Sequence, residues 1–175
     1  MIMVKIVQKK SKVLRRVAQK VPLKNIKSPA TKKILAGMKK ALASQKDGVA
    51  IAAPQINKSL RIFVVVEDMF NAKEENRKAV PSYKIFINPV IVKLSKKQDE
   101  LEEGCLSIRW EYGKVKRASK ATVQAYDESG KSFTHSSSGL LAQIFQHEID
   151  HLDGVLFTDK AVNLRSIKPD STSGD

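Results

Sequence analysis

The sequence has few of the features that mark a secreted or membrane protein. Cys105 is the single cysteine among 175 residues, so no disulfide framework is possible and a reducing, intracellular setting is expected. No apolar run approaches the ~20 residues that a transmembrane helix needs. The apolar stretch at the N-terminus is also too short for a signal peptide. We therefore expect a cytoplasmic protein with no membrane partner.

Acidic residues are scarce relative to basic ones. The chain has 32 Lys and Arg against 18 Asp and Glu, which gives a net charge of +14. Such an excess favours a polyanionic neighbour, such as nucleic acid or a ribosome. The lysines are scattered along the chain rather than grouped, so tuning for solubility is an equally good explanation at this point.

The chain is long enough to fold without disulfides. A length of 175 residues and an apolar content of 42% indicate one globular domain with a real core. We find no internal repeat and no long linker. We predict a single catalytic domain over residues 1–163, followed by a polar, flexible tail over residues 164–175 that is rich in Ser, Gly and Asp.

One helix and several strands are expected in the first three quarters of the chain. Ser28 can cap a helix that Pro29 begins and that ends before Gly48. The charged stretch from Met69 to Ser82 indicates an exposed loop. Pro89 indicates an edge position or a bend in its strand. Strands are expected at residues 59–68 and 83–94, and a hairpin is expected at residues 120–136.

The last major element is predicted to be a buried helix over residues 138–152. Leu140, Ile144, His147 and His151 fall on one stripe at helical spacing. The neighbouring faces are apolar too, because of Leu141, Phe145, Ile149 and Leu152. A helix that is apolar nearly all round is buried, so its two histidines are expected inside the protein.

The segment "QHEIDH" at residues 146–151 has the spacing of a metal site. Histidines at positions i and i+4 point the same way from a helix, so His147 and His151 can bind one ion. Glu148 lies beside them and can hold and deprotonate a water. The alternative is a pair of buried histidines that hydrogen-bond to backbone or to Asp150. Asp150 is otherwise expected to orient a histidine or an arginine.

Two further segments offer a third ligand and an oxyanion donor. Cys105, in "EEGCLSI", would be a good transition-metal ligand as a thiolate, although most lone cysteines are small buried hydrophobes. Gln55 ends the small-residue stretch "GVAIAAPQI" and could donate to a developing oxyanion. A tight loop packed under a helix would explain that stretch equally well.

Together, "GVAIAAPQ", "EGCLS" and "QHEIDH" resemble, in this order, the three motifs of the peptide deformylase family. The resemblance also covers "VLRRVA", "INP", "VKRA" and "GVLFTD", and so spans nearly all of the chain except the tail. It begins so early that we expect no long targeting segment. It implies an α+β fold, with short antiparallel β-sheets packed around a central metal-binding helix, and a bacterial-type cell.

The resemblance implies a specific reaction. The family removes the formyl group from the N-terminal formyl-methionine of nascent polypeptides and releases formate. Cys105, His147 and His151 would bind one divalent metal ion, natively Fe²⁺, with Zn²⁺, Ni²⁺ or Co²⁺ as possible substitutes. Metal-bound hydroxide would attack the formyl carbon, with Glu148 as general base and then acid. The Gln55 amide and the backbone N–H of Leu106 would hold the oxyanion.

The substrate would contact a set of residues in which this chain departs from the family pattern. Ala50 replaces a glycine, and we expect it to narrow the cradle and lower activity. Gln143 lies one turn before His147, and we expect it to weaken the preference for methionine. Arg109 stands where a proline is frequent and, with Trp110, is expected to alter the groove rim. The predicted substrate-binding residues are Val49, Ala50, Gly104, Gln143 and Ile144.

Two other functions stay open at this point. The chain could be a metallohydrolase of the same fold that acts on another N-acyl substrate. It could also be a weakly active or inactive homologue that associates with the ribosome through its basic surface. An intact Glu148 favours the enzyme, because a structural metal needs no water-activating carboxylate. We expect a monomer.

Overall fold

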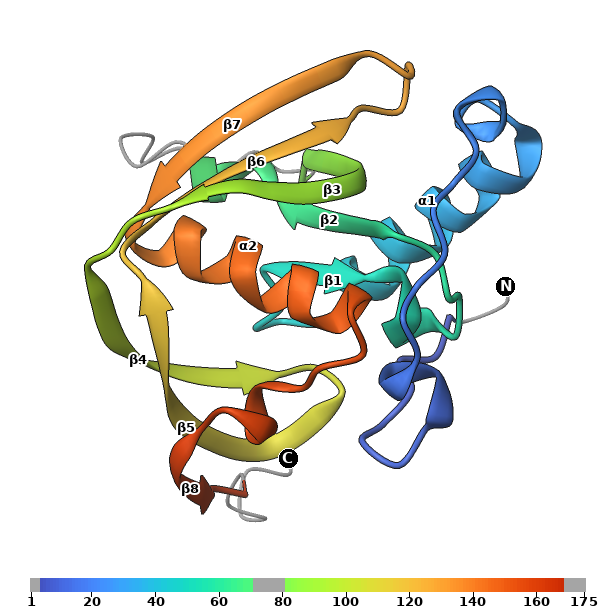
Figure 1. Cartoon of the computed structure of the whole chain (residues 1–175). Helices are drawn as coiled ribbons and strands as arrows, with labels where there is room; N and C mark the ends of the chain where they lie inside the picture. The colour runs from blue at the N-terminus through green and yellow to red at the C-terminus, as the bar shows by residue number, and fades with distance from the viewer. Residues whose placement is uncertain (1–3, 71–80, 169–175) are drawn as a thin grey trace.

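The computed structural model describes residues 4–70 and 81–168, and it has one helix between two antiparallel sheets. Helix α2 (Gly139–Leu152) lies in the middle of the molecule (Figure 1). The larger sheet has the order β1-β2-β3-β6-β7 and the smaller one the order β4-β5-β8. The strands of the larger sheet are β1 (Ala50–Ala52), β2 (Ile62–Val66), β3 (Tyr83–Leu94), β6 (Lys120–Tyr126) and β7 (Ser132–Ser138). The strands of the smaller sheet are β4 (Gln98–Cys105), β5 (Ile108–Ala118) and β8 (Val162–Ser166).

The chain crosses between the two sheets at one end of α2. β3 continues into β4, and β5 continues into β6, so that the two sheets share this corner (Figure 1). Backbone hydrogen bonds close the corner: Ser95 N–H donates to Lys120 C=O, and Ser119 N–H donates to Lys97 C=O, each at 3.0 Å. The predicted α+β fold, with antiparallel sheets packed around the central helix, is confirmed.

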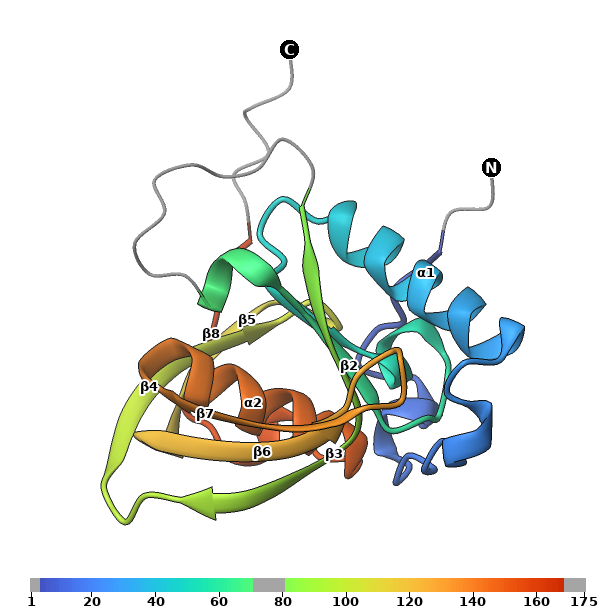
Figure 2. The same ribbon diagram turned by 90° about the horizontal axis from the view of Figure 1, so that it is seen from above.

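The larger sheet is covered on both faces. Alternate residues of β2 point in opposite directions, as in any strand. Ile62 and Val64 pack in the cluster that contains Leu35 and Met38 of α1 (Pro29–Ala43). The intervening Phe63 and Val65 pack with Phe86, Val123, Phe145 and Ile149. Figure 2 shows α1 and α2 on the two sides of this sheet. Burial on both faces explains why β2 reads as a continuous apolar run.

Several local predictions are confirmed. The Ser28 side chain accepts a hydrogen bond from Thr31 N–H at 3.2 Å and caps α1. Residues 120–138 form the expected hairpin. Pro89 marks a bend, since the β3–β6 register shifts between Ile87 and Val90 while β3 lies inside the sheet. Five short 3-10 turns complete the described elements: Lys12–Arg15, Leu23–Asn25, Ala53–Ile56, Glu67–Phe70 and Phe157–Asp159.

Two predicted boundaries need correction. Met69 and Phe70 do not belong to an exposed loop: they lie in a 3-10 turn and pack against the core cluster of α2, while residues 71–80 lie outside the described residues. The predicted tail boundary at residue 164 falls inside β8, which pairs with β5. Residues 169–175 lie outside the described residues. No helix in the described part of the chain is long and apolar enough to cross a membrane.

Candidate metal centre

Two elements bring the three predicted ligands together. Cys105 is the last residue of β4, and His147 and His151 project from successive turns of α2. Their ligand atoms all lie within 4.8 Å of one another. The Cys105 Sγ atom lies 3.2 Å from His151 Nε2. His151 is only 1% exposed and the His147 side chain is 12% exposed, so both histidines lie largely inside the protein, as expected.

The donor set suits a divalent transition metal. A thiolate and two imidazoles are ligands that zinc or ferrous iron accepts, and three protein ligands leave one position open. Burial raises the pKa of the Cys105 thiol, but the charges and hydrogen bonds of His151 and His147 outweigh it and lower the pKa to about 5. The chain therefore favours the thiolate, which is the form that binds a metal.

A buried carboxylate network orients His147. Glu103 Oε2 lies 2.9 Å from His147 Nδ1, so the opposite ring nitrogen, Nε2, is left to face the centre. Arg117 donates two hydrogen bonds to Glu103, at 2.7 and 2.9 Å. Burial raises the pKa of Glu103, but Arg117 and His147 outweigh it and lower the pKa to about 2. Glu103 is therefore an ionised partner of this candidate metal ligand.

Sequence reasoning missed Glu103 and Arg117. The available signal was an acidic residue two positions before Cys105, since metal-bound histidines usually donate to a carboxylate. Asp150, predicted to orient a histidine or an arginine, accepts a hydrogen bond from Arg117 at 2.6 Å and from Lys160 at 2.8 Å. Asp150 therefore orients the arginine and not a histidine. Its link to His147 runs through Arg117 and Glu103.

Glu148 lies beside the ligands as a buried acid. It is 4% exposed, and its Oε2 atom has no hydrogen-bond partner among the described residues. Burial raises the pKa of Glu148 to about 7, against the opposing charges of His147 and His151. An unpartnered buried carboxylate oxygen is costly. This oxygen is available for a water at the centre, as a proton-transferring group requires.

Gln55 and Leu106 present N–H groups next to Cys105. Gln55 Oε1 accepts a hydrogen bond from Ala52 N–H at 2.8 Å, which turns the amide NH₂ toward the centre. That NH₂ lies 3.6 Å from Cys105 Sγ and 3.2 Å from Ser107 Oγ. The Leu106 N–H donates no hydrogen bond to any described group. Both predicted oxyanion donors therefore lie at the site, and each has an N–H group placed to donate a hydrogen bond there.

The N-terminal segment forms hydrogen bonds with the backbone carbonyls of these two donor residues. Val7 N–H donates to Gln55 C=O at 2.9 Å, and the Gln8 side chain donates to Leu106 C=O at 3.2 Å. The 3-10 turn Ala53–Ile56 that carries Gln55 is fully buried. Residues near the start of the chain thus help to hold both predicted oxyanion donors in place.

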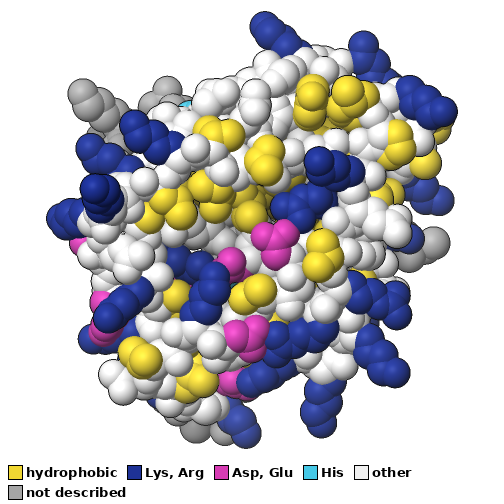
Figure 3. Space-filling model, viewed as in Figure 1, with side chains coloured by type: hydrophobic (Ala, Val, Ile, Leu, Met, Phe, Trp, Pro, Cys, Tyr) yellow, Lys and Arg dark blue, Asp and Glu magenta, His cyan; other side chains and the backbone are white. Residues whose placement is uncertain are grey.

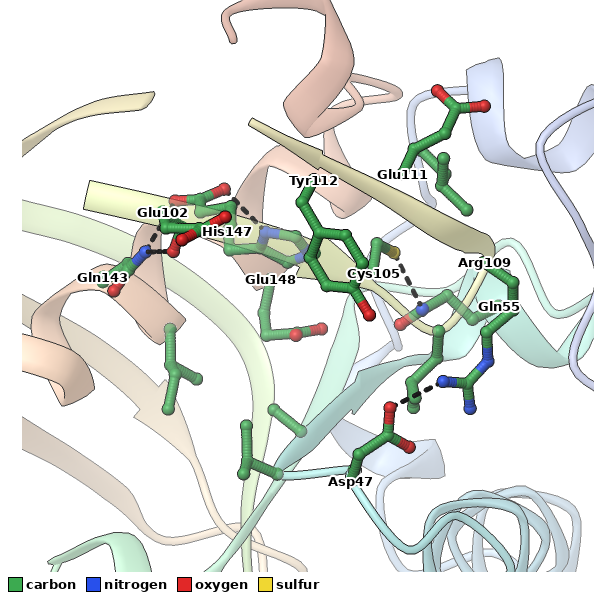
Figure 4. Close-up of a pocket in the computed structure, with 18 of the residues that line it drawn as sticks. Asp47, Gln55, Glu102, Cys105, Arg109, Glu111, Tyr112, Gln143, His147 and Glu148 are labelled. Carbon is green, nitrogen blue, oxygen red and sulfur yellow. Dashed lines mark hydrogen bonds and ion pairs between the residues drawn. The ribbon is translucent and has the colours of Figure 1, made fainter. Parts of the chain in front are cut away.

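A cleft of about 370 Å³ opens onto the centre (Figure 4). β1 forms one wall and is an edge strand, so its free backbone faces the cleft. The opposite wall comes from the turn between β4 and β5. On the face of the molecule seen in Figure 1, Lys and Arg are spread out rather than gathered in one patch (Figure 3). The predicted substrate residues all line the cleft: Val49, Ala50, Gly104, Gln143 and Ile144.

The departures from the family pattern have local structural explanations. Ala50 does not have positive φ, and its side chain packs in the cluster that contains Ile144 and Phe145. Gln143 lines the cleft, but its amide NH₂ is held by Glu102 C=O at 2.9 Å. Alanine therefore fits the backbone conformation at position 50, and the donor end of Gln143 is turned toward β4.

The rim residue Arg109 joins the two walls of the cleft. Arg109 lies on β5 and forms an ion pair at 2.7 Å with Asp47, which lies on the opposite side of the cleft. Arg109 also contacts the Gln45 side chain. Trp110 has φ of 67° and is 38% exposed, with its ring 5.7 Å from the Arg109 guanidinium. The predicted altered rim is therefore built around an ion pair rather than a proline.

Comparisons with known proteins identify the family of the chain. Residues 3–166 match the family model for polypeptide deformylase. Peptide deformylase 2 of Clostridium acetobutylicum is 43% identical over 130 residues, which are 73% of this chain and 77% of the relative. The crystal structure of a peptide deformylase from Legionella pneumophila superposes with a TM-score of 0.78 at 35% identity, over 93% of this chain and 88% of that one.

A second solved structure carries a bound peptide. It is the Met-Ala-Ser-bound class I type b peptide deformylase of Acinetobacter baumannii, with a TM-score of 0.79 and 29% identity, over 91% of this chain and 98% of that one. The family resemblance of the sequence is thus confirmed by sequence relatives and by the fold. The chain belongs to the polypeptide deformylase family.

Proposed function

We propose that the chain removes the formyl group from the N-terminal formyl-methionine of nascent polypeptides at the centre formed by Cys105, His147 and His151. Membership of the family makes the chain a hydrolase of N-formyl groups. The observation that supports this site is the convergence of the three ligand atoms beside the unpartnered carboxylate oxygen of Glu148.

The donor set supports one divalent metal ion as cofactor. The proposal is Fe²⁺ as the native ion, with Zn²⁺, Ni²⁺ or Co²⁺ able to take its place. Such an ion supplies Lewis acidity, which lowers the pKa of a water and polarises the formyl oxygen. Glu103 holds the ring of His147 in the orientation that such a ligand needs.

The residues around the centre divide the remaining work. Glu148 takes a proton from the attacking water and passes it to the amine nitrogen as the carbon–nitrogen bond breaks, so that formate and a free N-terminus leave. The Gln55 NH₂ and the Leu106 N–H donate to the oxygen that gains negative charge. Val49, Ala50, Gly104, Gln143 and Ile144 contact the formyl-methionine, with the free edge of β1 as a backbone partner.

Partners other than the nascent peptide are inferred from the sequence alone. The excess of 14 positive charges favours contact with a polyanion such as the ribosome. The ribosome contact, the cytoplasmic location and the monomeric state stay predictions.

Formate release tests the proposal directly. Iron-loaded protein kept anaerobic is expected to release formate from formyl-Met-Ala-Ser. The substitution Glu148→Ala should lower kcat by about 10²–10⁴-fold, because it removes the proton-transferring group. The bound metal, measured by elemental analysis, should stay near the wild-type level, since Glu148 is not a ligand.

The matched control is Glu128→Ala, which removes a carboxylate that is 60% exposed on the β6–β7 hairpin. It should leave kcat within twofold of wild type. A Glu148→Ala variant that keeps the wild-type rate would rule out this role of Glu148. Wild-type protein with full metal content and no formate release would contradict the proposed reaction.

A further inference from the structure

Tyr112 is a cleft residue to which the proposed reaction gives no role. It lies on β5, opposite the end of β4, and it is half-buried. Its ring is seated on Gly104. A Cβ atom at Gly104 would come within 2.8 Å of Tyr112 Cε1 and 2.9 Å of Cδ1, so a larger residue at this position would force the ring to move. The glycine before Cys105 therefore provides the space that fixes this ring.

The seated ring directs the phenol hydroxyl into the cleft. Figure 4 shows the side chain reaching from β5 across the mouth, with its hydroxyl pointing into the space in front of Cys105 and Glu148. The neighbouring rim charges are already paired: Glu111 with Lys9 at 2.6 Å, and Arg109 with Asp47. The Tyr112 hydroxyl has no hydrogen bond with any described residue, so its donor faces the cleft unused.

Tyr112 also stands where the cleft meets a second hollow. That hollow shares Glu102, Glu103, Gly104 and Tyr112 with the main cleft. It continues to Arg165 of β8 and to Ile167, which follows that strand. A formyl-methionine at the metal centre must send the rest of its chain out through the mouth. A peptide that leaves toward this hollow passes Tyr112, which lines both the cleft and the hollow.

We propose that Tyr112 is a further substrate-binding residue, whose hydroxyl donates a hydrogen bond to the peptide carbonyl that follows the formyl-methionine. The inference rests on the proposed function. This contact is the same in the ground state and in the transition state, because the carbonyl takes no part in bond breaking. It therefore lowers KM and leaves kcat unchanged.

The substitution Tyr112→Phe isolates the hydroxyl, since the ring keeps its seat on Gly104. We expect KM for formyl-Met-Ala-Ser to rise about 3–10-fold, the range of one neutral hydrogen bond. The kcat value should stay within twofold, and the metal content should be unchanged. The dissociation constant of the product Met-Ala-Ser, measured by calorimetry, should rise by a similar factor.

The matched control is Tyr126→Phe, which removes a hydroxyl at the end of β6, where the ring packs against the core cluster of α1. It should leave KM and product binding within twofold of wild type. An unchanged KM in Tyr112→Phe would overturn the proposal, and so would a fall in kcat at constant KM. If the wild-type protein releases no formate, the proposed function fails, and equal Met-Ala-Ser binding by both proteins then overturns the Tyr112 contact as well.

Discussion

Glu103 shows how one side chain can orient a candidate metal ligand. It connects His147 to the buried Arg117, and it is itself only 5% exposed. Its pKa of about 2 keeps it ionised at any physiological pH, so the bond to His147 persists. A carboxylate hydrogen-bonded to a ligating histidine fixes the ring and increases its basicity. Glu103 is therefore expected to affect metal affinity without touching the metal.

The substitution Glu103→Gln tests this role. It keeps the shape of the side chain, but it removes the charge that His147 and Arg117 share. We expect the affinity for Zn²⁺ to fall about 10–100-fold, as is typical when the partner of a ligating histidine is lost. Competition with a chromophoric chelator measures the dissociation constant.

The control for this prediction lies on the same strand. Glu100 on β4 pairs with Lys114 at 3.7 Å and is 41% exposed. Glu100→Gln should bind Zn²⁺ as wild type does. If both glutamine variants keep wild-type affinity, Glu103 is only a structural partner of Arg117.

The sequence was sufficient to predict the site residues whose spacing along the chain indicates their function. His147, Glu148 and His151 share one helix, so their separation in the sequence fixes their separation in space. Glu103 and Arg117 meet only because β4 and β5 pair, at positions fourteen residues apart that are not in direct register. Nothing in the local sequence specifies that pairing, and for this reason the network remained hidden until the structure was known.

Helix α2 is held to the corner between the sheets by Gln146. Its Oε1 accepts from Ala118 N–H at 3.0 Å, and its Nε2 donates to Ala118 C=O at 3.0 Å and to Ala142 C=O at 2.9 Å. Gln146 thereby satisfies the backbone of Ala118 where β5 ends. The residue just before His147 thus sets where the metal-binding turn of α2 lies.

The substitution Gln146→Leu should destabilise the protein. It leaves the N–H and C=O groups of Ala118 buried without partners, and each such group costs about 1–3 kcal/mol. We expect the free energy of unfolding to fall by about 2–4 kcal/mol. Urea denaturation of the metal-loaded proteins measures this difference.

The control is Gln124→Leu, which changes an exposed residue of β6. Surface substitutions of this kind are usually within about 0.5 kcal/mol of wild type. A Gln146→Leu variant as stable as Gln124→Leu would show that α2 is held by its apolar packing alone.

Strand β4 shows why one element escaped prediction. Half of its sequence "QDELEEGC" is acidic, and the segment has little β propensity. In the fold, Glu100 lies opposite Lys116 and Glu102 lies opposite Lys114 on β5. Opposite charges across a strand pair are favourable, so the acidic run is a strand because of its basic partner. A prediction made along the chain cannot see such a partner.

On the scale of the whole molecule, the three candidate metal ligands come from both layers of the fold. Cys105 belongs to the smaller sheet, whereas His147 and His151 belong to the helix that packs against the larger one. The two motifs lie 42 residues apart, with the corner and the hairpin between them. The order of the strands could not be derived from the sequence, because it depends on the crossings at the corner. The family resemblance supplied the fold that periodicity alone did not.

A bound metal should therefore stabilise the whole fold. An ion at 100 times its dissociation constant adds about 2.7 kcal/mol to the free energy of unfolding. For a chain of this size, 1 kcal/mol shifts Tm by about 2–4 °C, so we expect Zn²⁺ to raise Tm by about 5–10 °C. Calorimetry of the chelator-treated protein, before and after addition of Zn²⁺, measures the shift.

In the control variant Cys105→Ser, the same addition of Zn²⁺ should raise Tm by less than half as much, because a hydroxyl is a poor ligand for zinc. Equal shifts in the two proteins would show that Zn²⁺ binds elsewhere, and that Cys105 does not connect the smaller sheet to α2 through a metal.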